Sequence, residues 1–394
     1  MTIIVGIWTA GLNWFAVKAI LAIFIFALPL PAQDLQLGAL RTTIMAMRET
    51  PNASRPTRGA TAELTTAKRQ HRDWVESLLT KFPENGDEAA LLDQIHNGLR
   101  DAKLFCTDYN LECYPSNRGF VDEAVVGRDR GFLIIQTAIG IFCGYDYSAY
   151  LYRWTNNGWR RFFETEQTTY TEKGYRPQML HSIHISEPDA AGNRMILTLG
   201  SQPGCAAAYQ PAYFRVFPMN ARFEVQRPVL DGSELIFVGS EPPITGRILP
   251  DDLMIEFDAG GTGYGEPHKA VRHFELRNGR ATQVGPIAPT ARDFVEEWIS
   301  MTWNRSANYS ESPALQPWHV KLHRDDGMGD FPDPAVRCTN GTWQIGTHLH
   351  DGPKTYYRIR FKEPYHFTMV EVSDRSFSDC TVADPKGDEH LKLF

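Results

Sequence analysis

Apolar residues in two stretches near the start of the chain recur every three or four positions, which is the spacing of a helix face. The first stretch covers residues 60–81 and the second covers residues 87–104, and the breaker Pro83-Glu84-Asn85-Gly86 lies between them. A connection this short places two helices antiparallel. The pattern therefore predicts a helical hairpin over residues 59–105, capping one edge of a sheet.

Beyond about residue 119 the period of the pattern changes to two. β-Branched and aromatic residues cluster there between Gly, Pro and Asn breakers, which is typical of strands. The clearest strands are predicted at residues 132–137, 147–154, 159–168, 179–186 and 195–200. The dipeptide Asn157-Gly158 predicts a two-residue hairpin turn, because both residue types tolerate the positive φ that such turns require.

Similar turn signals follow at Asn220-Ala221, Asn278-Gly279 and Asn340-Gly341, at successive intervals of 63, 58 and 62 residues from Asn157. The first two intervals each hold strand-like runs for four strands, the content of a propeller blade. The third contains a predicted helix at residues 291–301, which Thr290 and Asp293 begin in a capping-box pattern. The predicted fold class is therefore mainly β and α+β overall: antiparallel sheets, sandwich-like or irregularly propeller-like, with an N-terminal helical hairpin and one short internal helix.

Residues 1–33 are the most continuously apolar part of the chain, and Lys18 is their only charged residue. The apolar core from Ala19 to Ala32, followed by polar chain, is typical of a signal peptide that is cleaved after Ala32. A tilted segment running through Lys18 is long enough to serve instead as an uncleaved anchor. We therefore expect an extracytoplasmic protein, secreted or periplasmic, with anchoring in the membrane by this segment as the alternative.

The composition divides the rest of the chain. Residues 33–58 are rich in Ala, Thr and Arg and contain two prolines, which predicts a polar linker. The predicted organisation is a signal peptide or anchor at 1–32, a linker at 33–58, the helical hairpin at 59–105, and a β-rich globular domain at 106–394 with a potential division near residue 288.

All six cysteines lie beyond the apolar segment, and they are Cys106, Cys113, Cys143, Cys205, Cys338 and Cys380. The chain has no C-x-x-C pair and no zinc-finger spacing of Cys and His, so an exported chain would use these residues for disulfides. Six cysteines allow 15 pairings. Pairing between sequence neighbours is the simplest: 106 with 113, 143 with 205, and 338 with 380.

The charge balance bears on partners. The chain has 40 Lys and Arg against 47 Asp and Glu, and no run of basic residues alternates with aromatics. An acidic surface repels phosphate backbones, so no nucleic-acid partner is expected. Other partners are not predicted, and contact with a membrane is expected only through an uncleaved N-terminal segment.

Aromatic residues are densest around the Asn157-Gly158 turn. The candidates for ligand binding are Tyr152, Trp154, Trp159 and Arg161, because a flat aromatic face on a strand pair can stack sugars or peptides. A two-residue turn at Asn157-Gly158 would place Trp154 opposite Arg161 and Tyr152 opposite Phe163. Packing within a β core is the structural alternative for these side chains.

Candidate catalytic and metal-binding residues are few. Glu164 and Glu166 share one side of a predicted strand, where two carboxylates could divide acid and base work, although exposed strand faces commonly carry such residues. His319 and His323 would share one face of a helix, and His181 with His184 is a further pair. Val320 stands where the metalloprotease motif requires Glu, so no metal or other cofactor is predicted.

No motif for a catalytic nucleophile occurs: the chain lacks G-x-S-x-G and lacks S-x-x-K with its partner motifs. The leading hypothesis is an exported, disulfide-stabilised, β-rich protein that binds a ligand or partner without catalysis. The alternative is an extracytoplasmic hydrolase, with carbohydrate as the candidate substrate and Glu164 or Glu166 as the candidate catalytic residues. A structural envelope protein is the third hypothesis.

Overall fold

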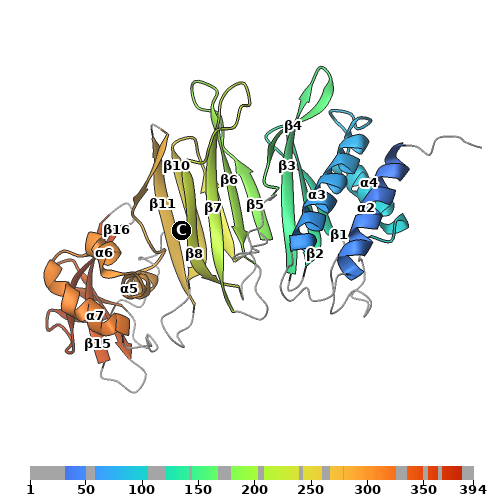
Figure 1. Ribbon diagram of the computed structural model, residues 1–394. Coiled ribbons are helices and arrows are strands. Elements are labelled where there is room, and N and C mark those ends of the chain that lie inside the picture. The colour runs from blue at the N-terminus through green and yellow to red at the C-terminus, as the bar shows by residue number, and fades with distance from the viewer. Residues whose placement is uncertain are drawn as a thin grey trace, which may run out of the picture.

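The structure is a computed structural model, and it describes residues 32–49, 58–104, 121–141, 144–166, 179–202, 208–238, 243–259, 267–277, 279–324, 335–348, 354–362 and 366–383 of the 394. Within these ranges the chain forms antiparallel sheets of four, eight and five strands, with helices at both ends of the molecule (Figure 1). The β-rich α+β prediction is therefore confirmed.

Helices cover one face of the four-stranded sheet (Figure 1). The helices are α2 (Ala32–Glu49), α3 (Arg58–Leu79) and α4 (Glu88–Asp101), and the strands, in sheet order, are β1 (Val121–Asp129), β2 (Phe132–Ile141), β3 (Gly144–Thr155) and β4 (Gly158–Glu164). Helices α3 and α4 are the predicted hairpin. The Asp87 carboxylate caps α4 by accepting a hydrogen bond from the N–H of Ala89.

The predicted linker at 33–58 is wrong over most of its length, because residues 32–49 form α2. Leu40, Ile44 and Met47 recur at helical spacing and are buried against the other helices. The polar residues between them lower the average hydropathy of the segment and hide this narrow apolar stripe. Ordering the segment costs conformational entropy. Burial of the apolar stripe offsets this cost, and it requires the neighbouring helices to be folded.

The eight-stranded sheet lies at the centre of the molecule (Figure 1). Its strands are β5 (Met179–Ile185), β6 (Arg194–Ser201), β7 (Tyr209–Met219), β8 (Leu230–Phe237), β9 (Ile244–Ile248), β10 (Asp252–Ala259), β11 (His268–Arg277) and β12 (Arg280–Val284). The order is β12-β11-β10-β8-β7-β6-β5, and β9 pairs with β10. Strand β9 also lies against β5 and β6, so the sheet curls around its own core. One continuous sheet here excludes the propeller-like arrangement.

The sandwich-like arrangement is present where the first two sheets meet. One apolar cluster joins Leu151 and Phe163 of the four-stranded sheet to Ile183, Ile185 and Ile196 of the eight-stranded sheet. The same four-stranded sheet therefore has helices on one face and a sheet on the other. Alternation of side chains along each strand makes this double burial achievable.

The C-terminal part combines three helices with the five-stranded sheet. The helices are α5 (Ala291–Ser300), α6 (Trp303–Ser306) and α7 (Gln316–Arg324), with short 3₁₀ turns at Ala307–Tyr309 and Pro313–Leu315. The strands are β13 (Val336–Cys338), β14 (Trp343–His348), β15 (Lys354–Lys362), β16 (His366–Ser373) and β17 (Cys380–Ala383). Helix α5 begins as predicted, with the N–H of Asp293 donating to the Thr290 hydroxyl. The sequence predicted a single internal helix, which is α5. The shorter helices α6 and α7 were missed.

One predicted disulfide is present: Cys338 on β13 is bonded to Cys380 on β17. The two residues are register partners on adjacent strands. The other four cysteines lie outside the described residues, as do residues 1–31.

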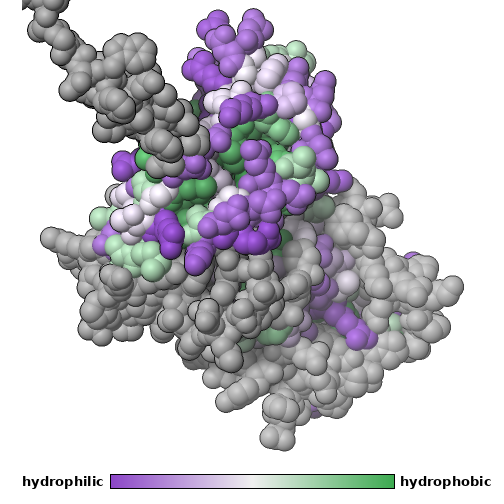
Figure 2. Space-filling view, turned by 90° about the vertical axis from the view of Figure 1, so that its right-hand side faces the viewer, coloured by the Kyte–Doolittle hydropathy of each residue, from purple (hydrophilic) through white to green (hydrophobic). Residues whose placement is uncertain are grey.

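Among the helices that the structure describes, none is both long and apolar enough to cross a bilayer. The face formed by α2–α4 shows hydrophilic side chains with hydrophobic patches between them (Figure 2).

The hairpin at Asn157-Gly158 forms, but one residue earlier than predicted. Thr155 pairs with Gly158, so Asn156 and Asn157 are the loop residues and Gly158, with φ of 91°, begins β4. The Thr155 hydroxyl donates to the Gly158 carbonyl and accepts from the N–H of Asn157, which stabilises the turn at this position. The predicted cross-strand pairs Trp154–Arg161 and Tyr152–Phe163 are therefore wrong.

Candidate functional site

The two candidate carboxylates are held by arginines between α3 and the four-stranded sheet. Arg72 on α3 donates to Glu166 at 2.8 Å, and the hydroxyl of Tyr150 donates to the same carboxylate oxygen at 2.9 Å. Glu164 lies 3.7 Å from Arg72 and 3.4 Å from Arg161. The Glu166 side chain is only 2% exposed. A guanidinium thus occupies the space between the carboxylates that a substrate would need.

Of the candidate aromatic residues, Tyr152 is buried inside the protein, whereas Trp159 is half-buried and Trp154 is exposed. The hydroxyl of the buried Tyr152 donates to Glu76 of α3 at 3.3 Å, and burial first, then the Glu76 charge, raises the pKa of this phenol well above its usual value. Arg161 also pairs with Glu76, at 3.0 Å. Trp159 donates its ring N–H to the Phe82 carbonyl at 3.0 Å, and Trp154, 37% exposed, packs edge-on against Trp159.

We call this region the helix–sheet interface. It comprises the face of α3 with Lys68, Arg72 and Glu76, the face of β3 with Asp146, Tyr150 and Tyr152, and the two carboxylates that pair with Arg72, Glu164 and Glu166. Lys68 and Asp146 form an ion pair at 3.3 Å, and their side chains are 1% and 0% exposed. Arg72 and Glu76 follow Lys68 at intervals of four residues along α3 and also bond to polar groups of the sheet. Arg72 donates to Glu166, and Glu76 accepts from Tyr152. Most of the candidate residues near the turn therefore contribute to attaching α3 to the sheet.

The candidate metal ligands His319 and His323 share one face of α7, as the spacing predicts, and their rings stack at 5.6 Å. Each ring meets a backbone carbonyl at the end of α5: His319 Nε2 lies 3.0 Å from Trp298 O, and His323 Nδ1 lies 2.8 Å from Ile299 O. Carbonyls at a helix end lack intrahelical partners, so the two rings satisfy them. The described residues contain no group of three or more potential metal ligands.

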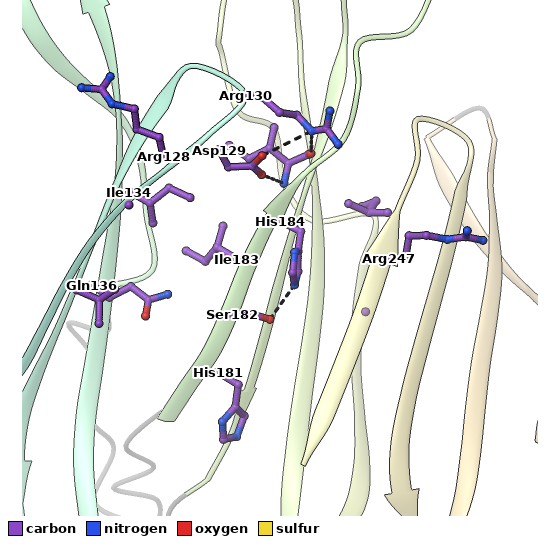
Figure 3. A pocket seen from close by; sticks show the side chains of 15 residues that line it. Arg128, Asp129, Arg130, Ile134, Gln136, His181, Ser182, Ile183, His184 and Arg247 are labelled. Atoms are coloured by element: carbon purple, nitrogen blue, oxygen red, sulfur yellow. Dashed lines mark hydrogen bonds and ion pairs between the residues drawn. The ribbon is translucent and has the colours of Figure 1, made fainter. Parts of the chain in front are cut away.

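The cleft that no motif predicted lies where the four-stranded and eight-stranded sheets meet (Figure 3). It has a volume of about 550 Å³. Its lining comes from the β1–β2 hairpin, β5 and β9: Val125, Gly127, Arg128, Asp129, Arg130, Ile134, Gln136, His181, Ser182, Ile183, His184, Ile185, Gly246, Arg247 and Ile248. This volume falls within the range of roughly 300–1,000 Å³ that is typical of ligand pockets.

The cleft follows the edges of strands. Five consecutive residues of β5 (181–185) and three of β9 (246–248) line it. Alternate side chains of a strand point to opposite faces, so consecutive residues line one cleft only when the cleft runs along the strand's edge. Strand β5 ends the order of the eight-stranded sheet, and β1 ends the order of the four-stranded sheet.

A β-bulge brings the histidines of β5 to the cleft. Leu180 pairs with Gly200 and Ser182 with Leu199, which leaves His181 as the extra residue in the ladder. His181 Nε2 lies 2.8 Å from the hydroxyl of Ser201, and His184 Nε2 lies 2.9 Å from that of Ser182. Burial lowers the pKa of both histidines, although Asp129 partly opposes this for His184. Both rings are therefore neutral at pH 7.

At one end of the cleft, side chains from β1 and the turn after it bond to β5. The N–H of Ile185 donates to Asp129 at 3.1 Å, and Arg130 Nε donates to the carbonyl of Ile185 at 2.6 Å. Arg130 also forms an ion pair with Glu187. The charges at this end are thus engaged with one another and with the backbone.

The remaining lining is mixed apolar and neutral polar. Ile134 and Gln136 of β2 point toward Ile183 of β5, whereas Arg128 and Arg247 point away from the strand (Figure 3). Neutral imidazole, hydroxyl and amide groups bind ligands through hydrogen bonds, and the isoleucines exclude water around them. The sequence offered one signal for this site, the His181 and His184 pair, but the bulge that makes both line the cleft depends on pairing with β6.

Comparisons with known proteins identify no family for this chain. No family model and no curated protein matches the chain. Among solved structures, an endo-1,4-beta-xylanase from Bacteroides thetaiotaomicron VPI-5482 aligns over 64% of this chain and 95% of its own length, with 8% identity and a TM-score of 0.16. A likeness this low carries no argument about fold or function.

Proposed function

We propose that the protein is a non-catalytic binding protein whose ligand occupies the cleft between β1–β2, β5 and β9. The observation that carries this proposal is the meeting of neutral hydrogen-bonding groups, His184, Ser182 and Gln136, in a cleft of about 550 Å³. Such a set of groups beside apolar walls is the usual make-up of a site for small or extended polar ligands.

The contrast with the other candidates supports the proposal. Glu166, Tyr152 and His319 each have partners within the protein, and their side chains are almost fully buried. The cleft histidines are only partly buried and bond to small hydroxyls. Neutral groups such as the cleft histidines can exchange a water or hydroxyl partner for a ligand without leaving a buried charge unpaired.

Calorimetric titration tests the proposal with three defined probes: a short neutral peptide, glucose and inorganic phosphate. We expect at least one to bind, and His184→Ala to weaken it about three- to tenfold, the worth of one neutral hydrogen bond. Glu164→Gln, at a partly exposed carboxylate of the helix–sheet interface, is the matched control and should leave affinity unchanged.

Two results would overturn this function. One is the absence of binding for all three probes at millimolar concentration. The other is a hydrolytic turnover that disappears on a single substitution, since that would make the protein an enzyme, and Ser182 would be the first position to replace.

We further propose that the protein works outside the cytoplasm. The Cys338–Cys380 disulfide supports this, because disulfides persist in oxidising compartments. The apolar segment before Ala32 supports it as well. Cell fractionation, with N-terminal sequencing of the recovered chain, tests the location: a reduced, uncleaved protein in the cytoplasmic fraction contradicts it.

A further inference from the structure

We propose that the ligand of the cleft is an extended peptide, which adds as a strand to the edge of β5 that faces away from β6. This inference rests on the proposed function and specifies its ligand. Strand addition gives affinity through backbone hydrogen bonds and selectivity through alternate side chains. The argument depends on which backbone groups of β5 face the cleft and on what they contact.

The pairing of β5 with β6 determines which groups face outward. The N–H of Ser186 donates to the carbonyl of Met195, and Ser186 follows the register pair Ile185–Ile196. In an antiparallel ladder, pairs that exchange hydrogen bonds alternate with pairs that do not. His184 therefore bonds to β6, as Ser186 does, whereas the N–H and C=O groups of Ile183 and Ile185 point away from β6 into the cleft.

Ile185 shows that these outward groups accept strand-like partners. Its N–H donates to Asp129 and its carbonyl accepts from Arg130, so two side chains bond to it as a neighbouring strand would. The corresponding groups of Ile183, two residues away, form no hydrogen bond to any residue in the described ranges. Within the described ranges, the strand edge is thus capped at one end and has no hydrogen-bond partner beside it.

The walls of the cleft define the chemistry of the peptide. Five residues of β5 face it, a length of about 16 Å at roughly 3.3 Å per residue. Side chains of an added strand would lie beside those of β5, alternately next to Ile183 and next to Ser182 and His184. The charges of Asp129 and Arg130 are already engaged. We therefore infer an uncharged peptide in which apolar residues alternate with small polar ones.

Binding of matched peptides tests this inference. The probe is a capped hexapeptide of alternating Val and Ser, used with two isomers that carry N-methyl groups on either the three Val or the three Ser residues. In an extended peptide only one of these sets of N–H groups faces β5. We expect one isomer to lose at least tenfold in affinity and the other to bind like the unmodified peptide. Equal affinity of the two isomers overturns strand addition.

Amide hydrogen exchange provides a second measurement on the unmodified protein. Saturation with the Val-Ser peptide should slow exchange of the Ile183 amide at least tenfold, while the His184 amide, already bonded to β6, should not change. An Ile183 amide that exchanges equally slowly without peptide means that the edge is already covered, and this also overturns the inference. If glucose or phosphate binds in a His184-dependent way and the peptide does not, the proposed function stands and strand addition fails.

Discussion

The helix–sheet interface and the cleft use similar residue types in opposite ways. In the interface, Lys68 faces Asp146 and Arg72 faces Glu166, and the paired side chains are mostly or fully enclosed. In the cleft, His181 and His184 are neutral and bond to serine hydroxyls. The difference shows that chemistry-bearing residues become available for binding only where the fold leaves them without a strong internal partner.

The physical reason is the cost of burying charge. An ion loses several kcal/mol of hydration when it enters the interior, so a buried charge persists only with a partner of opposite sign. A buried ion that is already paired cannot exchange its partner for a ligand without incurring the hydration cost again. Neutral groups at a partly open edge face a much smaller cost.

Removing one partner of the Lys68–Asp146 pair should have the largest effect. Asp146→Ala leaves the Lys68 ammonium enclosed without its carboxylate, and we expect a loss of about 3–5 kcal/mol in the free energy of unfolding. Urea denaturation followed by circular dichroism measures this loss.

A double variant provides the control for this prediction. Replacing Lys68 by Met and Asp146 by Leu removes both charges together, and stability should return to within about 1–2 kcal/mol of the wild type, because apolar groups of similar size replace a buried pair at little cost. A double variant as unstable as Asp146→Ala would mean that shape rather than charge governs this position.

Acid pH should destabilise the helical layer through His71 of α3. Burial lowers the pKa of this histidine to about 4 from an ordinary value of 6.5, and neither ring nitrogen has a hydrogen-bond partner among the described residues. Between these values the unfolded chain binds the proton and the folded chain does not. Stability should therefore fall by up to about 3 kcal/mol as the pH decreases from 6.5 to 4.

The comparison with His71→Leu isolates this contribution. The variant lacks the titrating group, so its stability should change less than that of the wild type over this pH range, while other groups titrate equally in both proteins. Urea midpoints at intervals of half a pH unit measure the difference. Parallel curves would show that His71 does not carry the acid sensitivity.

The smallest effect is expected in the cleft. Ser182→Ala removes a hydroxyl that is partly exposed and bonded only to His184 among the described residues, so the free energy of unfolding should change by less than about 0.5 kcal/mol. Affinity for the cleft ligand should decrease. A loss of several kcal/mol would place Ser182 with the structural residues of the interface and would weaken the distinction between the two regions.

Local signals predicted many elements correctly. The period of apolar residues located α3 and α4, and Thr290 with Asp293 marked the start of α5. Helix α2 was missed because its stripe of Leu40 and Ile44 lies within a polar composition. The hairpin turn lies one residue earlier than predicted, which moves the cross-strand pairing by two residues, because the side chain of Thr155 rather than Gly158 alone decides where the turn closes.

The candidate site was much less predictable. Glu166 and Tyr152 looked available because a sequence does not show that Arg72 and Glu76 lie opposite them, 94 and 76 residues away. His184 gave only a weak signal, because its position in a cleft depends on the bulge at His181 and on β9, which is 60 residues further along the chain.

The sequence by itself determined the elements whose causes are local: helices from apolar periodicity and caps, strands from alternation, turns from Asn and Gly, and a disulfide between neighbouring cysteines, Cys338 and Cys380. Only the tertiary structure decided which polar residues are enclosed with a partner and which line an open edge. That choice depends on contacts between segments far apart in the chain, and the energy of a polar group is set by its surroundings rather than by its neighbours in sequence.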